Sequence, residues 1–255
     1  MKLRHIISML LIIPGALTPA IAAPTTHTQA ITTEDIKQIL TKGSAEALKK
    51  LITNGIDPNT RVDNEIPLLV MAAYTKRLEM VYTLLESGAN PNAAQAPGIT
   101  ALSVAAATNN THMLDLLIKH GANINHQADL GDSILMLACS QNALDAVQLL
   151  LAMKADPNLA DNKGITPLIY SIARSNEPEV LCCMLLEHGA DPNARMFDGS
   201  TALMVAAMNN DINCAQLLLS HGADVEVQDA GANTALDFAK SPEMRQLLLS
   251  ADKND

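Results

Sequence analysis

The chain has 255 residues, with 17 basic and 27 acidic side chains, no tryptophan and only 2% aromatic residues. Its net charge of −10 makes nucleic acid and anionic membrane surfaces poor partners, because both repel an acidic protein. The scarcity of aromatic residues, beside abundant alanine and leucine, favours a stack of helices over a β-sandwich.

The first 22 residues have the order of a secretory signal peptide. Lys2 and Arg4 form a basic start, an apolar run follows over residues 6–17, and the small residues at 20–22 offer a cleavage site. The run is shorter than the ~20 residues that a membrane-spanning helix needs. We therefore expect export to a bacterial periplasm, with secretion as the alternative. Removal of residues 1–22 leaves 15 basic and 27 acidic side chains, a net charge of −12.

A flexible leader is predicted for residues 23–32, which show no apolar period. The first helices follow it. Thr32 and Asp35 have the spacing of a capping box, and apolar residues over 36–40 and 45–52 predict two short helices.

Two columns of residues then recur every 33 positions, which indicates a repeat architecture. The first column is a glycine before an apolar residue: Gly55, Gly88, Gly121, Gly189 and Gly222. The second is a leucine: Leu69, Leu102, Leu135, Leu168, Leu203 and Leu236. Lys154 fills the missing glycine position, at a cost of roughly 1 kcal/mol if that position is left-handed. Both columns place two extra residues between Leu168 and Gly189, where Pro178 is expected to begin a helix.

These motifs resemble the ankyrin-repeat family. Thr166-Pro167-Leu168 matches the T-P-L start of its units, and Asp156-Pro157-Asn158 matches the loop after its double leucine and Gly-Ala. The His that usually follows T-P-L is missing from every unit. The resemblance covers about residues 33–250. It implies an all-α ankyrin-repeat solenoid of helix-turn-helix units joined by β-hairpin-like loops, and protein–protein recognition in general.

We expect one domain over residues 33–255, with about seven repeats including degenerate units at both ends. Small residues should let the first helices of neighbouring units approach closely, while leucine pairs fill the layer between first and second helices. The small residues are Ala72, Ala105, Ala138, Ser171, Ala206 and Ala239.

The sequence shows no catalytic or metal-binding pattern. His120, His188 and His221 hold equivalent positions in units on the order of 10 Å apart, whereas zinc ligands lie about 2 Å from one ion. We interpret them as helix-end residues and expect no metal, no cofactor and no enzymatic activity. Cys139 is predicted to be a buried small residue. A bridge from the Cys182–Cys183 pair to Cys214 in the next unit is the alternative to four free thiols.

The function is expected to lie on a concave face formed by loop tips and first helices. The predicted partner-binding residues are Arg61, Asp63, Tyr74, Leu130, Lys163, Arg174, Arg195, Phe197, Asp198 and Met208. Phe197 has two interpretations: an exposed interface anchor, or a side chain folded under its own hairpin.

We expect a monomer that binds another protein, and the acidic charge favours a basic one. It would neutralise a toxin or lytic enzyme, or stabilise a resident enzyme. The alternatives are an effector secreted to act on host proteins and an enzyme built on the concave face.

Overall fold

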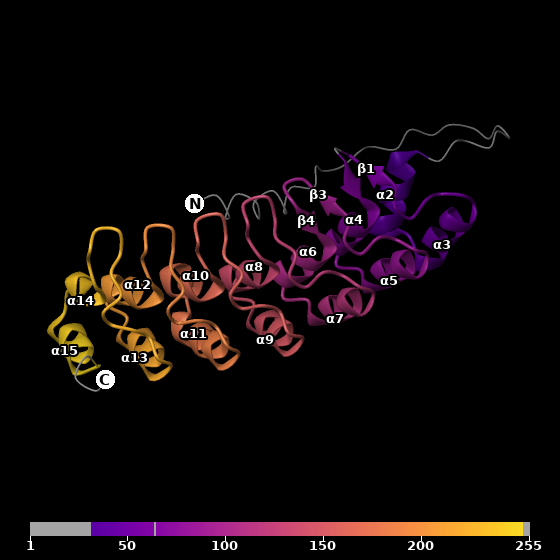
Figure 1. Ribbon diagram of the computed structural model, residues 1–255. Helices are drawn as coiled ribbons and strands as arrows, with labels where there is room; N and C mark the ends of the chain where they lie inside the picture. Colours follow the sequence, from indigo (N-terminus) through magenta and orange to yellow (C-terminus); the bar gives the residue numbers. More distant parts are fainter. Residues whose placement is uncertain (1–31, 64, 252–255) are drawn as a thin grey trace, which may run out of the picture.

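The computed structural model describes residues 32–63 and 65–251. Figure 1 shows the described helices in two rows, with hairpin loops projecting from the side of the first row. The order in space is the order in the chain, and neighbouring helices of each row contact one another. The predicted all-α solenoid is confirmed. The predicted signal peptide (1–22), the leader before Thr32 and residues 252–255 lie outside the described residues.

The described residues form seven helix pairs, each with an inner helix beside the hairpins and an outer helix behind it. The inner helices are α2 (Thr33–Lys42), α4 (Leu68–Tyr74), α6 (Ala101–Ala107), α8 (Ile134–Ser140), α10 (Pro167–Arg174), α12 (Ala202–Asn209) and α14 (Ala235–Phe238). The outer helices are α3 (Ala45–Thr53), α5 (Leu78–Glu86), α7 (Thr111–Lys119), α9 (Leu144–Ala152), α11 (Pro178–Glu187), α13 (Ile212–Ser220) and α15 (Pro242–Ala251).

In four of the described hairpins, a residue pairs with the one six positions later. Strands β1 (Arg61–Val62) and β2 (Ile66–Pro67) form one antiparallel pair, and β3 (Ala94–Gln95) and β4 (Ile99–Thr100) form the next. Isolated bridges join Gln127 to Ser133 and Arg195 to Thr201 in the same register. The β-hairpin-like loops expected between units are therefore present.

The core consists of the predicted columns. Leu69, Leu102, Leu135, Leu168 and Leu203 are each 1% exposed, and burying a leucine contributes about 1.5–3 kcal/mol. The small-residue column is buried between inner helices. Its one polar member, Ser171, is fully buried and donates its hydroxyl hydrogen to the Leu168 carbonyl at 2.8 Å. The small-residue prediction is therefore confirmed, and so is the leucine column except for Leu236 of the last unit, which is only partly buried.

The predicted special positions are also confirmed. Lys154 takes a left-handed φ of +68°, like the glycines of the other units. Pro178 is the first residue of α11, after the two extra residues. Thr32 and Asp35 form the expected capping box at the start of α2.

Threonine or serine hydroxyls cap four of the inner helices. The Thr100, Ser133, Thr166 and Thr201 side chains each accept a hydrogen bond from the backbone N–H three residues later, at the starts of α6, α8, α10 and α12. Such a cap contributes about 1 kcal/mol per helix. Helix α4, which begins after Pro67, has no side-chain cap.

A column of asparagines joins each unit to the next at the loop after the outer helix. The Asn158 side chain accepts a hydrogen bond from the Asp191 N–H at 2.8 Å and donates one to the Gly189 carbonyl at 3.0 Å. Asn59, Asn92 and Asn193 make the same two contacts with their following units. Because both atoms of one amide are used, each asparagine sets the register of two neighbouring loops.

A second glycine column lets the hairpins lie close together. Gly98, Gly131, Gly164 and Gly199 all have a left-handed φ. A Cβ on Gly164 would lie 2.9 Å from the Met196 Cα of the next hairpin. Ala232 holds this position in the last hairpin, with φ +61°, where no further hairpin follows in the described chain. Glu65 holds this position in the first hairpin, with φ +70°, so side chains occur at the two ends of the row and glycine at the four positions between them.

Gly164→Ala is expected to lower the free energy of unfolding by about 1–3 kcal/mol, because it combines a strained φ with a collision against the next hairpin. Urea denaturation followed by circular dichroism measures it. Ala232→Gly is the matched control and should change stability by less than about 1 kcal/mol. Equal losses in both variants would contradict the close-approach explanation.

Asn158→Ala is expected to lower the free energy of unfolding by about 1–2 kcal/mol, because two inter-unit hydrogen bonds are lost together. Glu226 occupies the same position one unit after Asn193, and its side chain makes no described hydrogen bond, so Glu226→Ala should be neutral. Thermal unfolding of the two variants tests this, and a neutral Asn158→Ala would refute the role of the column.

Candidate functional site

The hairpin tips and the exposed sides of the inner helices form one continuous surface, which we call the hairpin face (Figure 1). Its tips are joined by backbone hydrogen bonds. The Asp129 N–H donates to the Pro97 carbonyl, and the Phe197 N–H donates to the Lys163 carbonyl at 3.0 Å. Asn162 and Ala230 make the equivalent bonds to Leu130 and Asp198. These backbone groups of the tips therefore already have hydrogen-bond partners. A partner protein would be bound by the side chains of the face.

Both predicted arginine tips are used inside the stack. Arg61 Nη1 donates to the Ala94 carbonyl of the next hairpin at 3.0 Å, and Arg195 Nη2 donates to the Gln228 carbonyl. Gln127, which the sequence analysis did not single out, makes the same contact with the Ala160 carbonyl at 2.9 Å. Each of these side chains lies 33 residues before its acceptor, and this spacing was the signal in the sequence that could have predicted the contact. These residues first hold hairpins together, and the idea that they serve a partner stays a prediction.

Two further predicted residues also have partners within the chain. Asp63 forms an ion pair with Lys37 of α2. Tyr74 is half-buried, its hydroxyl donates to Gln95 Oε1 at 3.4 Å, and burial raises its pKa. The predicted residues of the first hairpins therefore already have partners within the chain.

The middle of the face is polar and charged. The Arg174 guanidinium lies 5.9 Å from the centre of the Tyr170 ring, a cation–π contact. Burial, followed by the negative charge of Asp161, raises the pKa of the nearby Asp132 carboxyl, while Lys163 lowers it. Arg174 and Lys163 are exposed, as predicted for surface residues.

Three of the predicted apolar side chains are exposed on the hairpin face. Phe197 is 80% exposed, Leu130 is 53% exposed and Met208 of α12 is 48% exposed. The interpretation in which Phe197 folds under its hairpin is wrong. Its neighbour Met196 packs against the core instead, because successive residues of the extended hairpin point to opposite sides.

A hollow of about 440 Å³ opens on the hairpin face at the two chain neighbours of Phe197, Met196 and Asp198. It is lined by Ala173, Met196, Asp198, Ser200, Val205, Met208, Asn209, Asp229 and Phe238. These residues come from α10, α12, α14 and the two hairpins on either side of α12. Two predicted residues, Asp198 and Met208, are thus brought to one place, with Phe197 between two of the lining residues. Met196, Val205, Asp229 and Phe238 were missed, because only the fold brings them together.

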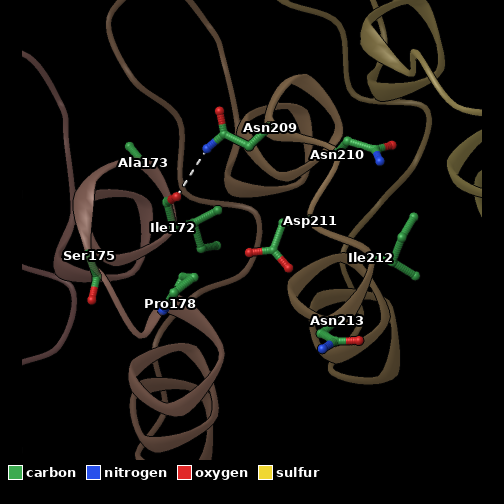
Figure 2. A pocket seen from close by; sticks show the side chains of 9 residues that line it. All are labelled: Ile172, Ala173, Ser175, Pro178, Asn209, Asn210, Asp211, Ile212 and Asn213. Atoms are coloured by element: carbon green, nitrogen blue, oxygen red, sulfur yellow. Dashed lines mark hydrogen bonds between the residues drawn. The ribbon is translucent and has the colours of Figure 1, made fainter.

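Figure 2 shows a second hollow, of about 570 Å³, at the turns between inner and outer helices. It lies where the two extra residues widen the turn from α10 to Pro178. Asn209 Nδ2 donates to the Ile172 carbonyl at 3.1 Å, and Asp211 accepts a hydrogen bond from the Cys214 N–H at 3.0 Å. Its polar groups therefore already hold helices α10, α12 and α13 in place.

Three histidines stand at the ends of outer helices. His120, His188 and His221 follow the last residues of α7, α11 and α13, and each Nδ1 lies 2.8 Å from the carbonyl oxygen four residues earlier. In residues 32–63 and 65–251, no group of His, Cys, Asp and Glu could hold a metal ion.

All four cysteines are free thiols. Burial raises the pKa of Cys139 to about 12, so its thiol stays protonated. A hydrogen bond with the Cys182 thiol raises the pKa of Cys214, which places these two thiols together across the unit boundary.

Known proteins are similar to this chain over its repeats. A family model described as ankyrin repeats (3 copies) matches residues 37–128, 69–161, 102–196 and 173–255. A stretch of 76 residues is 40% identical to the transient receptor potential channel pyrexia of Drosophila melanogaster, and 93 residues are 34% identical to BCL-6 corepressor-like protein 1 of Homo sapiens. The alignments cover 29% and 36% of this chain, but only 8% and 5% of the relatives.

Two solved structures share the architecture over most of the chain. The ankyrin repeat domain of Bcl-3 superposes with a TM-score of 0.78 at 26% identity, covering 84% of this chain and 97% of that domain. The human ASB11 ankyrin repeat domain gives a TM-score of 0.68 at 25% identity, covering 85% and 96%. Among the described helices of this chain, none is long and apolar enough to cross a bilayer.

Phe197→Ala is expected to change the free energy of unfolding by less than about 0.5 kcal/mol, because the ring is mostly exposed. Met196→Ala, one residue earlier, should cost about 1–2 kcal/mol, because that side chain packs against the core. Chemical denaturation of the two variants compares them directly. A larger loss for Phe197→Ala than for Met196→Ala would contradict the described hairpin.

Proposed function

Because this chain belongs to the ankyrin-repeat family, we propose that it is a non-catalytic monomer that binds one partner protein through the hairpin face. Ankyrin repeats form a protein–protein interaction module, and their fold is typically a scaffold without catalytic activity. A stack of similar units supports this use, since it offers an extended surface rather than one convergent pocket.

The observation that carries the proposal is the exposure of Phe197. An aromatic side chain that is 80% exposed contributes almost nothing to folding, yet aromatic residues dominate the energetic centres of protein interfaces. Met208 lines the hollow together with Met196 and Asp198, the two chain neighbours of Phe197. The part of the hairpin face formed by Phe197, Met208 and the hollow is therefore the proposed centre of the interface.

The proposed place of action is the bacterial periplasm, and the order of basic, apolar and small residues within positions 1–22 supports it. There the protein neutralises an incoming toxin or lytic enzyme, or stabilises a resident enzyme. The acidic composition supports a basic partner in either role. Secretion to act on host proteins is the alternative.

The test is capture from a periplasmic extract of the source bacterium by the immobilised protein. Replacing Phe197 and Met208 together with alanine should reduce capture of the partner at least ~10-fold, because a truncated interface centre costs about 2 kcal/mol or more. Quantitative mass spectrometry of the captured proteins gives the ratio.

The matched control replaces Val180 of α11 and Leu249 of α15 with alanine. These side chains are 43% and 44% exposed, close to the 48% of Met208, but they lie on outer helices. Capture should be unchanged in this control. Equal capture by all three proteins would disprove binding at the hairpin face, whereas capture from host cytosol and not from periplasm would favour the secreted alternative.

A further inference from the structure

The hollow beside Phe197 combines apolar walls with acidic groups. Met196, Val205, Met208 and Phe238 supply the apolar part of its lining. Asp198 and Asp229 supply two carboxylates from neighbouring hairpins, and no lysine, arginine or histidine is among the lining residues. The hollow is therefore negatively charged and apolar at the same time.

Both carboxylates keep unused capacity to accept hydrogen bonds. One oxygen of Asp198 accepts a bond from the Ser200 N–H at 3.0 Å, and no described donor reaches the other oxygen. Asp229 Oδ1 accepts bonds from the Gly231 and Asn233 N–H groups, and its Oδ2 contacts only the Asn233 amide. The Asn233 N–H bond lowers the pKa of Asp229, so this carboxyl stays ionised.

Neither carboxylate forms an ion pair within residues 32–63 and 65–251. The bases Arg195 and Lys240 lie near the hollow, but each hydrogen-bonds to a backbone carbonyl. Arg195 donates to the Gln228 carbonyl, and Lys240 Nζ donates to the Met208 carbonyl at 3.2 Å. The two carboxylates of the hollow are thus close to two cations but directly paired with neither.

This arrangement belongs to one unit of the repeat. Asp198 lies 35 residues after Lys163, the equivalent tip residue of the preceding hairpin. Met196 and Phe197 likewise stand where that hairpin has Asp161 and Asn162. Phe197 and Asp198 at this tip are specific to this unit, whereas Asp229 makes the same turn hydrogen bonds as Asp161.

We propose that this hollow receives a lysine or arginine side chain of the partner protein, flanked by apolar residues. The inference rests on the proposed function and specifies its partner. The aliphatic stem lies against Met196, Val205 and Met208, and the cationic head reaches the Asp198 and Asp229 carboxylates, because such side chains are apolar along the stem and charged only at the tip. Phe197 covers a neighbouring apolar residue of the partner.

The experiment uses the purified protein labelled with ¹³C in its methionine methyl groups, and the capped peptide Gly-Leu-Arg-Leu-Gly as the probe. The Met196 and Met208 methyl signals should shift saturably on titration, whereas those of Met80 and Met113, buried elsewhere, should not. The same peptide with citrulline in place of arginine keeps the shape without the charge. It should bind roughly fivefold more weakly, as expected for exposed charge pairs.

A variant that combines Asp198→Asn and Asp229→Asn should weaken binding of the arginine peptide roughly fivefold and leave the citrulline peptide unaffected. Asparagine keeps the oxygen that accepts the hairpin hydrogen bonds, so the fold is preserved. The control Glu243→Gln removes one carboxylate from exposed α15 and should change nothing.

Equal binding of both peptides, or no shift of the Met196 and Met208 methyls with either, would overturn the inference. This result is separable from the capture experiment. Partner capture that depends on Phe197 and Met208, but not on Asp198 and Asp229, leaves the proposed function standing and rejects the cationic side chain. Specific peptide binding without any captured partner would support the cationic-side-chain site and reject the proposed function.

Discussion

Each helix pair of this protein has an apolar side that only the next pair can cover, and the rest of the structure depends on this constraint. Alanines such as Ala105 and Ala206 bring the inner helices close, and the buried leucine column fills the space behind them. The hairpins must keep the same spacing, which is why glycine recurs at their tips. A chain stacked in this way grows in one direction and exposes a long face instead of enclosing a cavity.

Polar groups then determine the register between the units. Asparagines such as Asn158 use both amide atoms across the unit boundary, and the tip N–H groups donate to the preceding tip. Contacts between units also use side chains that are exposed on the surface. Arg61 and Arg195 are exposed, but both donate to the next hairpin, and Asp63 is paired with Lys37. Exposure alone therefore does not identify the residues that are free to bind.

The hairpin face differs along its length for this reason. Its first hairpins carry paired or small side chains, and its middle carries the Arg174–Tyr170 contact beside Asp132. Around α12 the repeat pattern changes, with Phe197 outside and Met196 inside the hairpin, and a hollow forms against α14. A repeat protein obtains specificity by such local departures, because exposed tip side chains that make no contact with the next unit can change without disturbing the stacking. The proposed function is assigned to the unit that departs most.

The sequence by itself determined the periodic features: the 33-residue spacing, the left-handed Lys154, the start of α11 at Pro178 and the buried columns. These follow from local conformational preferences and repetition, which are readable without knowing the contacts. The asparagine and tip-glycine columns were readable by the same spacing, but their roles lie in bonds to another unit. Only the tertiary structure decided which tips are free and that Asp198, Met208 and Phe238 share one hollow. Such groupings depend on how the units stack, and the period does not specify the orientation of a single side chain.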